Sequence, residues 1–172
     1  MVHIQPYSHE FQNQLIALIL DIQQKEFSIP ITLTDQPDLL NIPQVYQQGQ
    51  GNFWIALDAD QVIGTIALLD IGGNQGALRK MFVHKDYRGK HIGCGQQLLN
   101  RLLREASLQG ITTIYLGTTE FFKAAHRFYE KNGFVEIAQS QLPAHFPLVG
   151  VDTKFYQYQV TAPIVGASVA VV

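Results

Sequence analysis

Hydrophobic residues follow two spacings along this chain, and these spacings predict where strands and helices lie. Val2–Tyr7 has the pattern of a short strand, and Ser8 suits the start of a helix. Apolar residues then recur at helical spacing on one face: Phe11, Leu15, Leu18 and Ile22. Pro30 breaks the irregular stretch that follows, and a second helical stretch begins near Asp35 and stops at Gly49.

The middle of the chain changes to the pattern of strands. Phe53–Leu57 and Val62–Asp70 flank a polar turn, residues 58–61, which is a hairpin signal. A glycine-rich turn, residues 72–76, then leads into a third strand, Ala77–His84. We therefore expect an antiparallel meander of three strands.

A helix and a further strand come next. Leu98, Leu102 and Ala106 form one apolar stripe, Gly110 ends the helix, and Ile111–Leu116 is the following strand. A strand, a helix and a strand within about thirty residues form a crossover unit, so the two strands should be parallel.

The last elements complete a mixed sheet. Phe121–Asn132 is predicted to be a helix closed by Gly133, and Phe134–Ala138 and Lys154–Val160 are predicted strands. No repeat or linker divides the chain, so we expect one α/β domain with a mixed (α+β) sheet over residues 1–161. The apolar tail, residues 162–172, could pair with a sheet edge or with a second copy in a homodimer.

Composition narrows the class of protein. Hydrophobic residues make up 47% of the chain, which is typical of a globular protein. A net charge of −2 argues against nucleic acid or an anionic membrane as partner, although a local basic loop can hide in a neutral total. One cysteine, no signal-peptide pattern and a tail too short to span a bilayer favour a cytoplasmic location. The six histidines lack the spacing of zinc ligands, so no metal is expected.

The sharpest chemical motif is Tyr87–Gly95, between a predicted strand and a predicted helix. Its three glycines let the backbone turn tightly and approach a ligand. The first turn of a helix offers unpaired N–H groups and a positive dipole end, and Arg88 and Lys90 add charge. The motif predicts a diphosphate-binding loop, with a plain turn as the alternative. It lacks the Gly-Lys-Ser/Thr of a Walker loop and the acidic residue of a dinucleotide fingerprint.

Two segments resemble a known family. Tyr87 to Leu98, Tyr-Arg-Gly-Lys-x-Ile-Gly-x-x-x-x-Leu, resembles the signature of the GNAT superfamily of acyl-CoA-dependent N-acyltransferases, with His91 where glycine is usual. Ala125–Phe134 resembles the family's second pattern, Ala-x-x-Phe/Leu-Tyr-x-x-x-Gly-Phe. The resemblance covers residues 2–160 and implies a central mixed sheet of about six or seven strands flanked by about four helices.

The resemblance implies acetyl-CoA as co-substrate and gives Tyr129 the role of general acid. A phenol of pKa about 10 can protonate a departing thiolate of pKa about 8.5 and stay protonated itself at neutral pH. The alternative for Tyr129 is aromatic packing. The family often has Asn where this chain has Phe122, so Thr118 and Thr119 could contact the pantetheine arm instead. The implied CoA-binding residues are Met81, Phe82, Val83, Arg88, Gly89, Lys90, His91, Ile92, Gly93, Cys94, Gly95, Thr118, Ala125, Phe128 and Tyr129.

A base would help because an attacking amine must be neutral. Glu120 is the first candidate and Glu26 and His145 follow, with an ordinary surface role as the alternative for each. Cys94 falls at a predicted helix start, where a thiol can be acidified, but a packing role is favoured. In the family the loop that corresponds to Gln139–Asp152 often borders the acceptor pocket; a plain connector is the alternative.

The sequence therefore predicts an N-acetyltransferase that moves an acetyl group to a primary amine in a ternary complex. The near-neutral charge favours a small-molecule acceptor. A non-catalytic acyl-CoA-binding sensor and a nucleotide-binding regulator are the alternatives.

Overall fold

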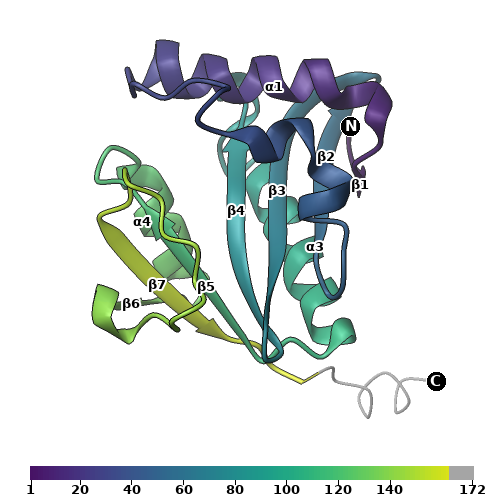
Figure 1. The fold of residues 1–172 in the computed structure, drawn as a ribbon. Helices are drawn as coiled ribbons and strands as arrows, with labels where there is room; N and C mark the ends of the chain where they lie inside the picture. The colour runs from purple at the N-terminus through teal and green to yellow at the C-terminus, as the bar shows by residue number, and fades with distance from the viewer. Residues whose placement is uncertain (163–172) are drawn as a thin grey trace, which may run out of the picture.

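A seven-stranded sheet organises residues 1–162, the part of the chain that the computed structural model describes (Figure 1). Its strands are β1 (Val2–Pro6), β2 (Asn52–Asp58), β3 (Gln61–Gly72), β4 (Gln75–Val83), β5 (Thr113–Thr118), β6 (Val135–Ile137) and β7 (Lys154–Gln159). They lie in the order β1-β2-β3-β4-β5-β7-β6. Only the pair β4 and β5 is parallel, which confirms the predicted crossover and the mixed sheet.

Helices cover both faces of the sheet. The α-helices are α1 (Gln12–Leu20), α2 (Ile42–Val45), α3 (Cys94–Gln109) and α4 (Lys123–Lys131). Shorter helical segments are η1 (His9–Phe11), η2 (Asp21–Glu26, π-helical), η3 (Pro37–Leu40), η4 (Lys85–Tyr87) and η5 (Gln139–Gln141). Among the helices of residues 1–162, none has the length and apolar character that a membrane crossing needs.

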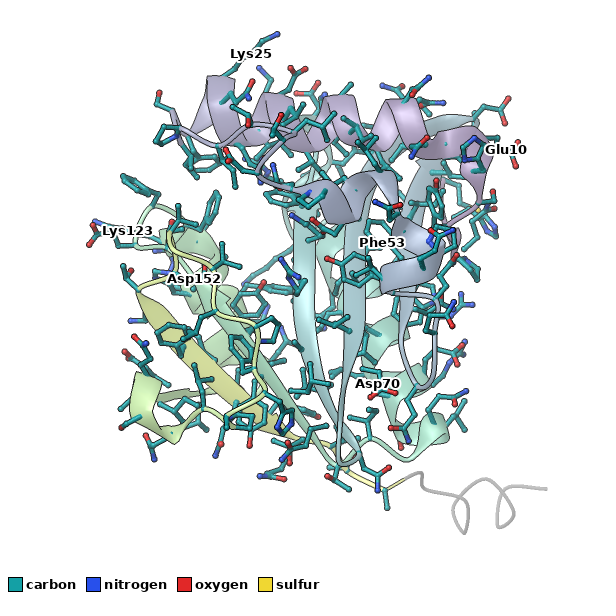
Figure 2. All side chains as sticks on the ribbon, in the orientation of Figure 1. Glu10, Lys25, Phe53, Asp70, Lys123 and Asp152 are labelled. Atoms are coloured by element: carbon teal, nitrogen blue, oxygen red, sulfur yellow. The ribbon has the colours of Figure 1, made fainter. Side chains whose placement is uncertain are left out.

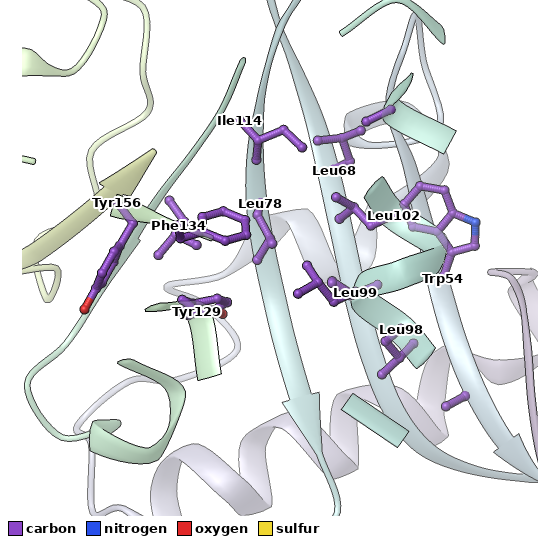
Figure 3. Close-up of a cluster of buried hydrophobic side chains, with 14 of the residues drawn as sticks. Trp54, Leu68, Leu78, Leu98, Leu99, Leu102, Ile114, Tyr129, Phe134 and Tyr156 are labelled. Carbon is purple, nitrogen blue, oxygen red and sulfur yellow. The ribbon is translucent and has the colours of Figure 1, made fainter. Parts of the chain in front are cut away.

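Alternation along β2 explains the two layers. Phe53 and Ile55 pack with the α1 helix, whereas Trp54 packs with α3 on the opposite face. Figure 3 shows Leu98, Leu99 and Leu102 of α3 beside Trp54. The two apolar faces of one strand therefore hold α1 and α3 in place on either side of the sheet.

The N-terminal third departs from the sequence prediction. The first helix is divided into η1, α1 and η2, and the second helical stretch forms only the short segments η3 and α2. Pro37 and Pro43 each lie within the first two positions of these segments, where proline is tolerated, but neither segment extends beyond four residues. Ser8 makes no capping bond, because its hydroxyl donates to Glu10 Oε1 at 3.1 Å. The predicted role of residues 163–172 lies outside the described residues.

Strands β4 and β5 separate after a short paired stretch (Figure 1). They pair only at Gln75–Ala77 with Thr113–Tyr115, while β4 stays on β3 as far as Val83 and β5 stays on β7. The β3–β4 register shifts around Lys80, which has φ +53°. A bulge of this kind bends a strand, and here it leaves one edge of β4 and one edge of β5 without a strand partner.

Candidate active site

The separation of β4 and β5 opens a cavity of about 1020 Å³. Its walls come from both strands, the start of α3, α4, η2 with the segment after it, and the loop before β7. Ligand pockets commonly measure about 300–1,000 Å³, so the cavity is large enough for a long ligand together with a small one.

Positive charge is concentrated in this cavity. Among residues 1–162, seven Lys or Arg residues line it, against a single carboxylate residue, Asp152. The cationic residues are Arg79, Lys80, Arg88, Lys90, Lys123, Arg127 and Lys131. The whole chain carries a net charge of −2, so the excess of positive charge is local and suits a ligand with several phosphates.

The glycine loop forms the N-terminal end of α3, as its sequence predicts. Gly89 and Gly93 have φ of +113° and +68°, a region that glycine enters without steric cost. Gly93 caps the helix without a side-chain bond, so the first-turn N–H groups have no partner within the helix. A Cβ on Gly95 would lie 3.5 Å from Met81 Cε, which places this turn against the open edge of β4.

Most residues that the family resemblance implied for CoA line the cavity. They are Met81, Phe82, Val83, Arg88, Gly89, Lys90, Gly93, Gly95, Thr118, Ala125, Phe128 and Tyr129. His91 is exposed, and Ile92 packs beside the α3 core. Cys94 is 1% exposed, and burial raises the pKa of its thiol to about 11, the opposite of an acidified thiol.

Arg88 is tied to protein groups rather than free at the cavity wall. Its two terminal nitrogens donate to the carboxylate of Glu26 in η2, and its Nε donates to the Val83 carbonyl at 2.8 Å. The hydrogen bond from Arg88 lowers the pKa of Glu26. Glu26 is therefore a weak base, and the pair fixes the glycine loop to η2 and to the end of β4.

Tyr129 lies between the two open strands, on the α4 side (Figure 3). Its ring packs at 5.5 Å from that of Phe134 and 6.1 Å from that of Tyr156. Burial, and then the nearby Tyr156, raise the pKa of Tyr129, so its hydroxyl stays protonated at neutral pH. The described residues offer this hydroxyl no hydrogen bond, and only Trp54 Nε1 among them is both fully buried and unpaired. Tyr129 therefore lines the cavity with a hydroxyl that is protonated at neutral pH and has no hydrogen-bond partner among residues 1–162.

The other predicted bases lie away from the cavity wall. Glu120 is exposed and does not line the cavity. His145 is also exposed, with Nε2 3.1 Å from Gln75 Oε1, although its neighbour Phe146 does line the cavity.

The carboxylate that does line the cavity, Asp152, was missed by sequence analysis. Burial outweighs the charges of Arg79 and Lys80 and raises the pKa of Asp152 to about 6. No local signal in the sequence marks it, because it belongs to an irregular loop (Figure 2). Two successive cations inside an apolar strand, Arg79 and Lys80, could have indicated the bulge.

Aromatic side chains connect the two sides of the opening. The Phe122 ring lies 4.8 Å from that of Phe27 and 6.3 Å from that of Phe82, both edge-on. Phe122 therefore packs where the resemblance led us to expect a polar residue. Thr118 and Thr119 both line the cavity, and the Thr119 hydroxyl accepts from the Phe121 amide at 3.0 Å in a local turn. Within residues 1–162, no group of three or more His, Cys, Asp or Glu is arranged to hold a metal ion.

Comparison with known proteins identifies the family. Residues 49–136 match the acetyltransferase (GNAT) domain. A GNAT-family acetyltransferase from Staphylococcus aureus Mu50 has the same fold, with TM-score 0.90 and 40% identity over 94% of this chain and 100% of that one. N-acetyltransferase 8F1 from Rattus norvegicus is 30% identical over 126 residues, 70% of this chain and 56% of the rat protein. N-acetylaspartate synthetase from Xenopus tropicalis is 36% identical over 102 residues, 58% of this chain.

The chain spans only 56% and 37% of the lengths of these two curated relatives. The S. aureus protein, in contrast, is matched over its whole length. The domain match, the fold and the open β4–β5 pair agree with one another. The chain belongs to the GNAT superfamily of acetyltransferases.

Proposed function

We propose that this chain transfers an acetyl group from acetyl-CoA to the primary amine of a small molecule. The observation that carries the proposal is the cavity between β4 and β5, which joins an uncapped helix start, a cationic wall and the hydroxyl of Tyr129. The names of the relatives, N-acetyltransferase and N-acetylaspartate synthetase, support the same reaction class.

The residues present fit the donor. The free N–H groups at the start of α3 are suited to a diphosphate, and Lys90, Lys123, Arg127 and Lys131 supply the cations that further phosphate charge requires. The open edge of β4 at Met81–Val83 offers backbone groups to an extended arm, as it would to an added strand. When bound, acetyl-CoA supplies an acetyl group activated as a thioester.

Two groups of the chain act on the reaction. A backbone N–H at the open edge of β4 polarises the carbonyl under attack and stabilises negative charge on its oxygen. Tyr129 gives its proton to the departing sulfur, and its hydroxyl carries that proton at neutral pH because burial disfavours the phenolate. The amine attacks the thioester directly, and Cys94 is unsuited to act as a nucleophile because burial raises the pKa of its thiol.

The test measures CoA release from acetyl-CoA with a thiol-reactive dye across a panel of primary amines, amino acids included. Release that depends on an added amine supports the proposal. Binding of acetyl-CoA without release for any amine would instead support an acyl-CoA sensor. Protection against heat by ATP that exceeds protection by CoA would support a nucleotide-binding regulator.

A further inference from the structure

The end of the cavity near η2 carries charged groups that phosphate binding and the general acid do not use. Leu78 and Met81 of β4 both pack on the α3 side of the sheet. Because the bulge adds a residue between them, Arg79 and Lys80 both project from the opposite face, toward η2 and the loop before β7. Two adjacent cations therefore enter the same part of the cavity.

The ammonium group of Lys80 is already paired with groups of the protein. Its Nζ lies 2.6 Å from Gln36 Oε1 and 3.5 Å from Asp38 Oδ2, and the Lys80 side chain is only 8% exposed. Asp38 also accepts from the Tyr46 hydroxyl at 2.6 Å, and Gln36 is held by Gln23 of η2. This network satisfies Lys80 and makes it a fixed part of the cavity wall.

Arg79, in contrast, is a half-buried cation without a partner. It lines the cavity, and its guanidinium makes no hydrogen bond or ion pair with any residue from 1 to 162. Its charge acts on Lys80 and Asp152, which places the three groups in one neighbourhood. A guanidinium has a planar pair of donors that fits a carboxylate in two parallel hydrogen bonds.

Asp152 faces this group from the other side of the opening. Its backbone N–H donates to Val149 at 3.0 Å, and the next residue, Thr153, donates to the Thr118 carbonyl at 2.9 Å. These bonds fix the loop to the end of β5. An added Cβ at Gly117 would lie 2.5 Å from Asp152 Oδ2, so the carboxylate rests directly on the β5 backbone.

Apolar side chains enclose the space around these charges. Phe27, Ile29 and Ile31 line it from the segment that follows η2. Phe146 and Val149 line it from the loop before β7. Within the described part of the chain, this end of the cavity therefore combines the unpaired cation Arg79, the carboxylate of Asp152 and apolar side chains around them.

We propose that the acceptor is a zwitterion, an α-amino acid with an apolar side chain, whose carboxylate binds Arg79 and whose amino group lies at Asp152; this rests on the acetyl transfer proposed above. A zwitterion matches each charge of the site with its opposite. A simple ammonium ion would instead bring a further cation beside Arg79, which forms no ion pair with any residue from 1 to 162.

The proton balance follows from this placement. Asp152 takes one proton from the ammonium group and passes it to solvent, and the neutral nitrogen attacks the thioester carbon. The C–N bond forms and the C–S bond breaks as Tyr129 protonates the sulfur. The second proton leaves the nitrogen and restores the Tyr129 phenol through solvent. The products are the N-acetyl amino acid and CoA, with one proton released per turnover.

The test compares matched pairs of acceptors in the CoA-release assay. Leucine and phenylalanine are each compared with the amine that lacks the carboxylate, isoamylamine and phenethylamine, and aspartate tests the apolar surround. We expect kcat/KM for the amino acids to exceed that for the amines by about 10- to 100-fold, the range for a hydrogen-bonded charge. Equal or better use of the amines, or a preference for aspartate, would overturn the inference while leaving acetyl transfer intact.

Variants assign the carboxylate contact to Arg79. Arg79→Gln should raise KM for leucine about 10- to 100-fold, with Arg79→Lys intermediate, whereas KM for isoamylamine should not rise, because the variant removes a cation that disfavours an ammonium ion. Arg127→Gln, at the α4 wall, is the matched control and should raise KM for acetyl-CoA instead. Equal losses for leucine and isoamylamine in Arg79→Gln would contradict the assignment. Absence of CoA release with every amine and amino acid would remove the proposed function as well.

Discussion

Replacing Gly117 by alanine places a methyl group against the carboxylate of Asp152, and the structure gives the size of the clash. The new Cβ would lie 2.5 Å from Asp152 Oδ2 and 3.1 Å from Phe155 Cε1, whereas ordinary contacts begin at 3.4 Å. The carboxylate must therefore move by roughly 1 Å, away from the β5 backbone.

A displacement of this size has unequal effects on activity and stability. Misplacement of a reacting group by about 1 Å can cost about 10²-fold in rate, so we expect kcat/KM to fall by that order. The φ of Gly117 is not positive, so alanine can adopt its backbone conformation. Alanine also reduces the conformational entropy of the unfolded chain, which stabilises the folded state by about 0.4–1 kcal/mol and offsets part of the cost of the clash. The melting temperature should change little.

The assay measures kcat/KM for CoA release with the most active acceptor, together with a melting curve. Gly150→Ala is the matched control. Gly150 lies in the same loop as Asp152, and a Cβ added there would meet no atom within 4 Å. We expect wild-type activity from Gly150→Ala and a large loss from Gly117→Ala. Equal activity in the two folded variants would refute a catalytic position for Asp152.

Three further predictions follow from burial and backbone conformation. The pKa of Asp152 rises from 3.8 to about 6 on folding, so its stabilising effect is present below about pH 4 and is lost as pH rises through 6. Asp152→Asn should accordingly raise the melting temperature at neutral pH and not at pH 4; equal shifts at both pH values would contradict the burial of Asp152. Cys94 should resist a thiol reagent in the native protein and react after denaturation, and rapid native labelling would exclude its packed position. Gly110 has φ +86°, so Gly110→Ala should lower the free energy of unfolding by about 1–2 kcal/mol. It should leave kcat unchanged, because Gly110 ends α3 outside the cavity. An unchanged melting curve would contradict the left-handed turn at the end of α3.

The strands and the long helix α3 could be predicted because the spacing of their hydrophobic residues reflects which faces of each element are buried. Phe53 and Trp54 pack on opposite sides of the sheet, as alternation requires, and Gly110 and Gly133 end helices in the left-handed conformation. The parallel β4–β5 pair followed from the length of the intervening helix.

The short helical segments were less predictable because tertiary contacts decide their form. The apolar stripe that includes Ile22 is compatible with an α-helix, yet Asp21–Glu26 is π-helical, and Glu26 at its end binds Arg88. Arg88 was expected at the phosphates from its charge and from the family resemblance. Its engagement with Glu26 depends on a residue 62 positions away, which no local pattern reports.

The candidate site divides in the same way. The half of the site that binds the acetyl donor is formed by two contiguous motifs, Tyr87–Gly95 and Ala125–Phe134, so it could be predicted from the sequence. Its acceptor half joins Arg79, Gln36 and Asp152 from separate parts of the chain, and only the fold brings them together. Glu120 comes just after β5 along the chain but does not line the cavity, whereas the loop before β7 supplies the carboxylate that does.

The central claim is that Tyr129 donates a proton to the departing thiolate in a cavity that binds acetyl-CoA. The most direct measurement determines, for wild type and Tyr129→Phe, the Kd for acetyl-CoA by calorimetry and kcat for CoA release. Loss of the hydroxyl alone should leave Kd unchanged and lower kcat by about 10²- to 10⁴-fold, the usual contribution of a general acid. An unchanged kcat in Tyr129→Phe would contradict the account.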